Sequence, residues 1–314
     1  PLYHFKNAVI VVALDADFMG FGPSAVRYTK DFSSRRRIGT PAEQQNRLYA
    51  IEPVPTITGT QAEHRVAVKA RDVHHIALAF AAAVGVATPG AGAPGALTER
   101  MQKVLPVMAQ DLLDHGGRSV VVAGPHQPAA VHALARAMNE ALGNVGSTVV
   151  YTTTIAATPA DGAASLADLV ADMNGSKVDV LLILGGNPVF TAPVDLGFTE
   201  ALSHVGTRVH LGLYYDETAE LCDWHVPEAH FLESWGDARA FDGTVSLQQP
   251  LIAPLYDGHQ AIELLAALNS AQGRPPADLV KTYWAQRAAS GGFTDQAGQA
   301  FGSTDAFWRA TLHE

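Results

Sequence analysis

The stretch VDVLLILGGNPVFTAPVDL, residues 178–196, decides the fold. It begins with an almost continuous apolar run and changes abruptly to Gly185, Gly186, Asn187 and Pro188. An unbroken run of Val, Leu and Ile is typical of a parallel strand that is buried on both faces, and glycines at its carboxyl end indicate a loop. Ligands of open α/β sheets lie at the carboxyl ends of strands, so this loop is the first candidate for a binding site.

The rest of the chain alternates apolar strands with helical patterns. Such alternation predicts right-handed βαβ units and an α/β fold of two Rossmann-like, doubly wound domains with mainly parallel sheets. Strands are expected at 7–18, 47–54, 119–124 and 148–153, and helices at 22–36, 71–85, 98–115, 128–144 and 165–175.

Two features indicate how the chain is divided. The segment ATPGAGAPGAL at 87–97 has too many breakers for a helix or a strand, so it predicts a linker between a first domain, 1–97, and a second, 98–314. Residues 8–23 and 179–193 each contain an apolar strand, a sharp loop and a proline. They therefore predict corresponding loops in two related domains.

Composition excludes several classes of function. With 314 residues, of which 47% are hydrophobic and 17% charged, the chain can bury a large core. Its formal net charge of −10 would repel the phosphates of nucleic acid and of an anionic membrane surface. No apolar stretch is long enough to span a membrane. The first residue is Pro rather than Met, so a segment of a longer protein is expected.

Cysteine usage argues against a metal or redox centre in this segment. A single cysteine, Cys222, rules out a disulfide, a cluster held by several thiolates and a C-x-x-C-H haem site. Cys222, His225 and His230 have the right donor atoms for zinc. Their spacing matches no standard zinc site, however, and Pro227 and its apolar neighbours favour a strand instead.

Two further candidate sites lie in the first domain. GFGPSA at 20–25 fits G-x-G-x-x-A, with Glu43 at a suitable distance for a ribose contact, but residues 15–19 separate these glycines from the strand. Asp15 and Asp17 are either a carboxylate pair for a divalent ion or acid–base chemistry, or caps for the amides of their own loop. No G-x-S-x-G elbow is present, and no catalytic residue is assigned.

Taken in order, the motifs at 181–193 and 214–258 resemble the molybdopterin oxidoreductase family. They include a G-x-N-P loop, E-T-A and A-D-x-x-L-P elements, and an acidic-glycine segment before a Q-containing strand. Residues 51–72 fall where that family places its D-P-R, T-x-x-A-D and G-x-D elements. The resemblance implies the fold of domains II and III of that family, which together cradle the pterin dinucleotides of a molybdenum or tungsten cofactor.

The resemblance also implies site residues. Gly186, Asn187 and Pro188 would form the cofactor loop of the second domain, with Glu217 and Thr218 as its neighbours. Small residues in such a loop let the backbone approach a pyrophosphate. The cofactor implied by the family is molybdopterin guanine dinucleotide.

The first domain departs from the family pattern. Residues 15–18 read Asp-Ala-Asp-Phe where the family has G-x-N-P, and Glu52, Pro53 and Val54 replace D-P-R, so the arginine is missing. Two carboxylates that face the crevice would repel a pyrophosphate. We therefore expect that the first loop no longer accepts the cofactor.

With these departures the chain resembles a narrower group within the family. This group is the large iron–sulfur subunit of alternative complex III, a bacterial quinol oxidoreductase. ALDADF at 13–18, TITGTQAEHR at 56–65 and residues 127–151 carry this likeness. In that subunit, a molybdopterin-oxidoreductase-like domain has lost its molybdenum and precedes an iron–sulfur part of the same polypeptide.

This likeness implies a non-catalytic scaffold without a cofactor of its own, with iron–sulfur clusters on another part of the parent chain. Its partners would be other subunits or domains of a membrane electron-transfer complex, on the periplasmic side of the inner membrane and without direct insertion. A cytoplasmic location stays open. The alternative is a fragment of an active, molybdopterin-dinucleotide-dependent oxidoreductase.

Overall fold

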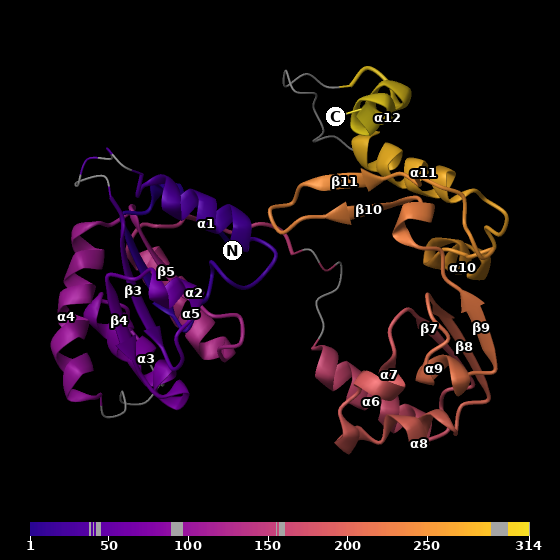
Figure 1. Cartoon of the computed structure of the whole chain (residues 1–314), viewed down its shortest axis with the longest axis horizontal. Helices are drawn as coiled ribbons and strands as arrows, with labels where there is room; N and C mark the ends of the chain where they lie inside the picture. The colour runs from indigo at the N-terminus through magenta and orange to yellow at the C-terminus, as the bar shows by residue number, and fades with distance from the viewer. Residues whose placement is uncertain are drawn as a thin grey trace. The chain divides into compact units, whose positions relative to one another are not determined.

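The structure, a computed structural model, divides into two compact units (Figure 1). Unit 1 is Pro1–Thr153 and unit 2 is Thr154–Glu314. Both contain parallel sheets with helices, which confirms the α/β class predicted from the sequence. The residues described are 1–37, 39, 41, 45–88, 97–154, 156, 161–289 and 301–313.

Unit 1 is built on a four-stranded parallel sheet. Its strands lie in the order β4-β3-β2-β5, so the chain adds β3 and β4 on one side of β2 and then returns to add β5 on the other. This reversal makes the carboxyl ends of β2 and β5 a topological switch point, where α/β proteins bind ligands. The strands are β2 (Ile10–Leu14), β3 (Arg47–Glu52), β4 (His64–Ala67) and β5 (Ser119–Ala123), and β1 (Leu2–Tyr3) pairs antiparallel with β6 (Val149–Val150).

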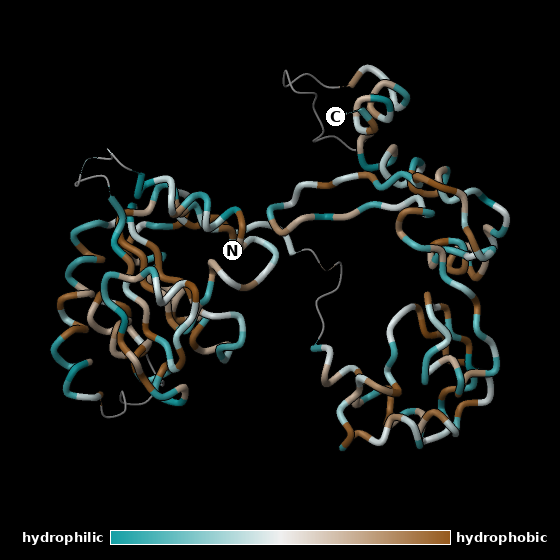
Figure 2. Tube along the Cα trace, in the orientation of Figure 1, coloured by the Kyte–Doolittle hydropathy of each residue, from teal (hydrophilic) through white to brown (hydrophobic). Residues whose placement is uncertain are grey.

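Helices and strands of unit 1 share one apolar core. All five residues of β2, IVVAL, are hydrophobic and buried. Figure 2 shows hydrophobic stretches in the strands of unit 1. The core joins them to side chains of the three longest helices of the unit. The helices are α1 (Ala25–Ser34), α2 (Ile57–Thr60), α3 (Val73–Ala83), α4 (Glu99–Asp114) and α5 (Ala129–Ala141), with 3-10 turns at Phe5–Asn7 and Ala70–Asp72.

The predicted domain boundary at residue 97 is wrong, because the elements that follow it complete the first sheet. β5 pairs along the whole of β2, and α4 places Met101, Met108 and Leu112 in the core of unit 1. Most of the predicted linker, residues 89–96, lies outside the described residues. The strand expected at 148–153 is the two-residue β6, which is antiparallel rather than part of a βαβ unit.

Unit 2 begins with a parallel sheet in the order β7-β8-β9. One side of this sheet packs against helices in a core that includes Leu181, Met173, Phe198 and Leu202. The strands are β7 (Val180–Leu184), β8 (Thr207–Gly212) and β9 (Trp224–Pro227), and the helices are α6 (Gly162–Asn174), α7 (Pro188–Thr191), α8 (Phe198–Leu202) and α9 (Glu217–Glu220), with a 3-10 turn at Val194–Leu196.

The rest of unit 2 has a second, smaller core around Val280, Trp284 and Phe307. Its elements are a 3-10 turn at Phe231–Glu233, the antiparallel hairpin of β10 (Gly236–Arg239) and β11 (Val245–Gln248), and the helices α10 (Ala261–Leu268), α11 (Pro276–Ala289) and α12 (Thr304–His313). Among the helices of the described residues, none is both long and apolar enough to cross a bilayer.

β7 differs from its sequence prediction. The apolar run predicts burial on both faces, yet Val180 is 63% exposed and Leu184 39% exposed. The reason is the uneven cover of the sheet: Leu181 packs against helices on one face, whereas Val180 and Leu184 lie on the opposite face, where no helix among the described residues joins that core.

Candidate functional site

The two units repeat one arrangement of strand, loop and short helix. β2 and β7 each have five residues, and the strand that follows each of them leads into a single-turn helix, α2 in unit 1 and α9 in unit 2. The first residue after β2 and after β7 has a positive φ, 51° at Asp15 and 66° at Gly185. The structure thus shows the repeat that the sequence predicts.

Hydrogen bonds at the ends of the two strands correspond. The Asp15 N–H donates to the Ile51 carbonyl at 2.7 Å, and the Gly185 N–H donates to the Leu211 carbonyl at 2.7 Å. Residues 15–18, the DADF loop, therefore take the place in unit 1 that residues 185–188, the GGNP loop, take in unit 2.

A buried threonine anchors each loop to the short helix beside it. The hydroxyl oxygen of Thr58 accepts from the Met19 N–H at 3.0 Å, and that of Thr218 accepts from the Val189 N–H at 3.0 Å. Both threonines have no exposed surface. The same interaction therefore fixes the distance between loop and helix in both units.

In unit 2 the structure brings together the site residues that the sequence predicts. The Asn187 side-chain amide donates to the Glu217 carboxylate at 2.6 Å, and the Thr218 hydroxyl donates to the Asn187 carbonyl oxygen at 2.7 Å. The bond from Asn187 lowers the pKa of Glu217 below its usual value. Pro188 follows as the first residue of α7, a position that suits its missing N–H.

A histidine pair beneath the GGNP loop is a feature that the sequence reasoning missed. His210 is fully buried, its Nε2 lies 3.1 Å from the Gly186 carbonyl oxygen, and its Nδ1 lies 3.1 Å from Nδ1 of His225. Because a carbonyl only accepts, Nε2 of His210 carries the hydrogen, and in the neutral pair Nδ1 of His210 accepts from His225. The available signal was His210 itself, a histidine between Val209 and Leu211 in β8.

The GGNP loop leaves room for a ligand to approach its backbone. Gly186 has a φ of 78°, and no atom lies within 4 Å of the position that a Cβ would take. Two carboxylates lie near the loop, that of Glu217, which accepts from Asn187, and that of Glu228, which lies 3.8 Å from the Cβ position of Gly185. The open backbone of this loop therefore has room for a pyrophosphate, but these two carboxylates would repel its negative charge.

The DADF loop is closed by another part of unit 1. The Asp15 carboxylate is buried and accepts from Nε2 of His126 at 2.7 Å and from the Gln127 amide at 2.8 Å. Gly124 lies so close that a Cβ there would overlap the Asp15 carbonyl oxygen. Asp15 therefore joins the loops after β2 and β5 instead of facing an open crevice, which corrects the expectation from the sequence.

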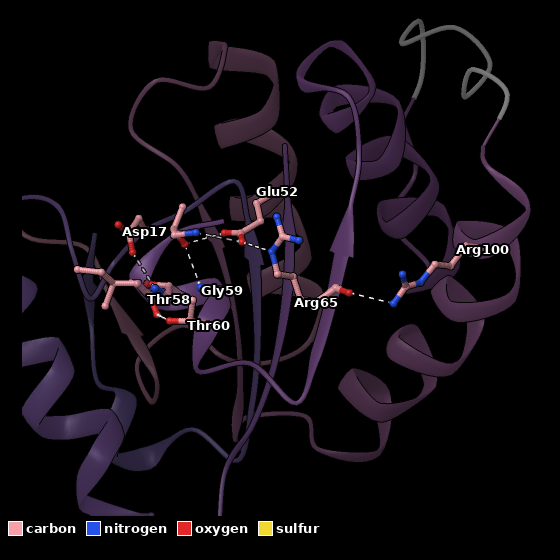
Figure 3. A network of polar contacts seen from close by, with 9 residues as sticks. Asp17, Glu52, Thr58, Gly59, Thr60, Arg65 and Arg100 are labelled. Atoms are coloured by element: carbon pink, nitrogen blue, oxygen red, sulfur yellow. Dashed lines mark hydrogen bonds and ion pairs between the residues drawn. The ribbon is translucent and has the colours of Figure 1, made fainter. Parts of the chain in front are cut away.

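Asp17 has a structural role as well. Its carboxylate accepts from the Thr58 N–H at 2.9 Å and so caps the first turn of α2, an amide of another segment rather than of its own loop as weighed from the sequence (Figure 3). Phe18 is buried and stacks on Phe5 with ring centroids 4.2 Å apart. With both carboxylates engaged and Phe18 packed into the unit, the DADF loop does not fit a pyrophosphate, and no reaction step is derived through one.

Glu52, which stands where the family has an aspartate, organises the next loop. Its buried carboxylate accepts from the N–H and the hydroxyl of Thr56. It also pairs with Arg65, as Figure 3 shows. The Arg65 carbonyl in turn accepts from Arg100 at 3.1 Å. Glu52 therefore positions α2 by contacts within unit 1.

The zinc site and the dinucleotide fingerprint do not assemble. Nδ1 of His230 accepts from the Leu232 N–H, and no group of three potential metal ligands forms within the described part of the chain, so Cys222, His225 and His230 make no zinc site there. Of the glycines at 20–25, Gly20 lies beside the Asp17 carboxylate, an anion that opposes a phosphate there. Glu43, the proposed ribose contact, lies outside the described residues.

A pocket of about 320 Å³ does lie at the switch point of unit 1. Aromatic and proline side chains dominate its wall, and Asp17, Ser24 and His132 are its polar members. Such a lining suits an apolar group better than a phosphate. The aromatic residues that line it are Tyr3, Phe18, Phe21 and Tyr28.

Comparisons with known proteins agree with this fold. The chain is 31% identical over 111 residues to the molybdopterin-binding-like subunit of menaquinone reductase from Nitratidesulfovibrio vulgaris. Its structure is similar to that of acetylene hydratase from Pelobacter acetylenicus, with a TM-score of 0.56, 12% sequence identity and 86% of this chain covered. No protein-family profile matches.

Both similar proteins are longer than the region they share with this chain. The match covers 34% of this chain but 16% of the menaquinone reductase subunit, and the chain covers 48% of the hydratase. The sequence likeness supports a relationship to molybdopterin-oxidoreductase-like proteins, and the structural likeness shows the fold.

Proposed function

We propose that the chain is a non-catalytic, molybdopterin-oxidoreductase-like module that acts as a scaffold within a membrane-associated, quinol-oxidising electron-transfer complex. Its likeness to a subunit of menaquinone reductase supports membership of a multi-subunit complex that handles quinones. Other subunits or domains of that complex are its partners. The alternative complex III subunit is the specific relative that we propose.

The closed DADF loop is the observation that carries this proposal. A glycine-rich loop binds phosphate through unengaged N–H groups in the absence of competing negative charge. Asp15 puts a carboxylate there and binds it to His126 and Gln127, so the loops after β2 and β5 hold each other at the switch point. The Asp15 carboxylate would have to leave this position before a phosphate could bind there.

The GGNP loop is, in this proposal, a vestige of the pterin loop. Gly186, Asn187, Pro188, Glu217 and Thr218 keep the geometry of the loop and contribute to the stability of unit 2. This segment then carries no cofactor, and iron–sulfur clusters belong to another part of the parent protein. The complex lies on the periplasmic side of the bacterial inner membrane, with the cytoplasm as the second candidate.

The second candidate function is a fragment of an active oxidoreductase that binds molybdopterin guanine dinucleotide. The open space at Gly186 favours it, because a backbone without a Cβ can approach a pyrophosphate closely. In that case the same five residues of unit 2 bind the cofactor.

Calorimetric titration of the chain with guanosine diphosphate and with released pterin dinucleotide separates the two functions. The scaffold predicts no heat beyond dilution. Micromolar binding that is lost in Gly186→Val and kept in Ser203→Ala, a surface change at the end of α8, would overturn the scaffold and establish the cofactor site.

A further inference from the structure

The repeated sheets of the two units differ at one edge. In unit 1, β2 pairs with β3 on one side and with β5 on the other. In unit 2, β7 pairs with β8, and no strand among the described residues pairs with its outer edge (Figure 1). This difference leaves main-chain groups on the outer edge of β7 without a neighbouring strand among the described residues.

The main-chain groups of β7 show which residues face the open edge. The Gly185 N–H donates to the Leu211 carbonyl of β8. Main-chain groups of successive residues point to opposite sides of a strand, so those of Leu182 and Leu184 point away from β8. Within the described residues, no group accepts from these two N–H groups.

Unit 1 shows what fits at this edge. Leu14 holds the place in β2 that Leu184 holds in β7, and its carbonyl oxygen accepts from the Gly124 N–H at 3.0 Å. The strand before Gly124 is β5, five apolar or small residues that run parallel to β2 with Ala123 opposite Leu14. The edge of β7 therefore has the geometry for a parallel apolar strand that ends in glycine.

The opposite edge of the same sheet is protected, whereas no strand of the described residues covers the outer edge of β7. The Glu228 N–H donates to the Gly212 carbonyl of β8, so Pro227 faces outward, where it has no N–H to offer. Its carbonyl oxygen already accepts from the His259 N–H at 2.9 Å. Natural edge strands are blocked by proline, lysine or a covering segment, and residues 178–184 contain neither proline nor lysine.

We infer that the outer edge of β7 is a docking site for one further strand, supplied by polypeptide outside residues 1–314. This strand runs parallel to β7, is rich in β-branched apolar residues and is followed by glycine. Its main-chain hydrogen bonds provide the attachment, and its side chains cover Val180 and Leu184. The inference does not depend on whether a cofactor binds to the GGNP loop.

A second copy of the chain is a poorer occupant of this edge. Two copies related by a two-fold axis would place their β7 strands antiparallel. The pairing of β2 with β5 that serves as the template is parallel, with evenly spaced bonds in a different pattern.

A peptide test uses the chain's own template strand. The probe is a synthetic peptide with the sequence of residues 118–127, RSVVVAGPHQ, added at millimolar concentration to the full chain. Amide hydrogen exchange, resolved by residue with NMR, is expected to become about tenfold slower at Leu182 and Leu184, the scale of one net hydrogen bond. Exchange at Leu181 and Ile183, which face β8, stays unchanged.

Two variants make the test specific. Leu182→Pro removes an outward N–H without breaking the pairing to β8, so it keeps the far-ultraviolet circular dichroism of the chain but loses the response to the peptide. Leu182→Ala, the matched control, keeps the response. A peptide with Val122→Pro lacks an N–H that faces the chain and is expected to give no protection.

Three results would overturn the inference. One is the absence of protection at millimolar peptide, and another is protection of Leu182 and Leu184 in the free chain, which would mean that residues 1–314 cover the edge themselves. The third is a dimer in sedimentation whose formation Leu182→Pro abolishes, since that would make a second copy the occupant.

Discussion

At the scale of single residues, Asn187 connects the GGNP loop to α9 by two side-chain hydrogen bonds. Asn187→Ala removes both and is expected to lower the unfolding free energy of unit 2 by about 1–2 kcal/mol, at about 1 kcal/mol for each net bond. Urea unfolding followed by tryptophan fluorescence is the measurement, because all 4 tryptophans of the chain lie in unit 2.

Glu217→Gln is the matched control for Asn187→Ala, since glutamine still offers an acceptor to the Asn187 amide. It is expected to cost less than Asn187→Ala. If Gly186 and Asn187 are structural, Asn187→Ala also leaves electron transfer by the assembled parent complex intact. Loss of turnover in a correctly assembled complex would speak against the scaffold.

His225 gives unit 2 a dependence on pH. Burial, and then the neighbouring His210, lower the pKa of His225 below its ordinary value of 6.5, while Asp216 partly opposes this. The unfolded state then binds more protons than the folded state, so the contribution of His225 is present above about pH 6.5 and is lost as the pH falls through the lowered pKa.

The measurement is the urea midpoint of tryptophan fluorescence at pH 7.5 and at pH 5.5. The midpoint is expected to fall at the lower pH, and to fall less in His225→Asn, which cannot take up the proton. An equal fall in both proteins would show that other groups cause the pH dependence.

Individual contacts were predictable only where a motif links the two partners. The contact of Asn187 with Glu217 and Thr218 follows from the order of the family's motifs. The partners of Asp15 do not, because His126 and Gln127 are more than 110 residues away and only the sheet brings them together. The sequence therefore suggested a carboxylate pair or caps for the amides of the same loop, whereas the structure pairs Asp15 and Asp17 with residues of other segments.

At the scale of elements, the repeat makes Thr58 and Thr218 equivalent anchors. Thr58→Val and Thr218→Val each keep the shape of the side chain but leave the N–H of Met19 or of Val189 without its acceptor, and Thr218→Val also removes the hydroxyl that donates to Asn187. Each is expected to destabilise its own unit by about 1–3 kcal/mol. Hydrogen exchange resolved by unit is the measurement, with Thr58→Ser and Thr218→Ser as controls that keep the hydroxyl.

A large loss in one unit and none in the other would contradict the equivalence of the two loops. The same is true if the serine variants lose as much stability as the valine variants, since the effect would then come from packing rather than from the hydrogen bond.

The elements were largely predictable because local patterns specify them. Apolar runs and helical periodicity place β2, β3, β5, α4 and α5 close to their observed bounds. The exposure of Val180 and Leu184 on β7 was not predictable, because it depends on which elements cover that face of the sheet. The apolar sequence of a strand indicates that it is suited to burial. It does not show which other elements cover the strand.

At the scale of the whole molecule, the structure divides the chain after Thr153 rather than at residue 97. A fragment of residues 1–153 is expected to fold cooperatively, whereas a fragment of residues 1–97 is not, because it lacks β5, α4 and α5 and leaves one edge of β2 unpaired. Circular dichroism during thermal unfolding distinguishes a sigmoidal transition from a gradual one.

A cooperative transition for 1–97 would restore the boundary that the Gly/Pro segment predicts. That segment misled the prediction because a run of glycine and proline marks a break in secondary structure, and such a break also occurs in connections within one unit. The strands that a unit contains are decided by pairing across the sheet, as between β2 and β5.

The central claim is that this module carries no molybdenum or tungsten cofactor. The most direct test is elemental analysis for both metals, combined with pterin fluorescence after oxidation, on the parent protein purified from its own host. The account predicts molybdenum and tungsten far below one atom per chain and no pterin signal. About one metal atom per chain together with a pterin signal would contradict it, because a protein with Asp15 and Asp17 engaged as they are here would then bind the dinucleotide after all.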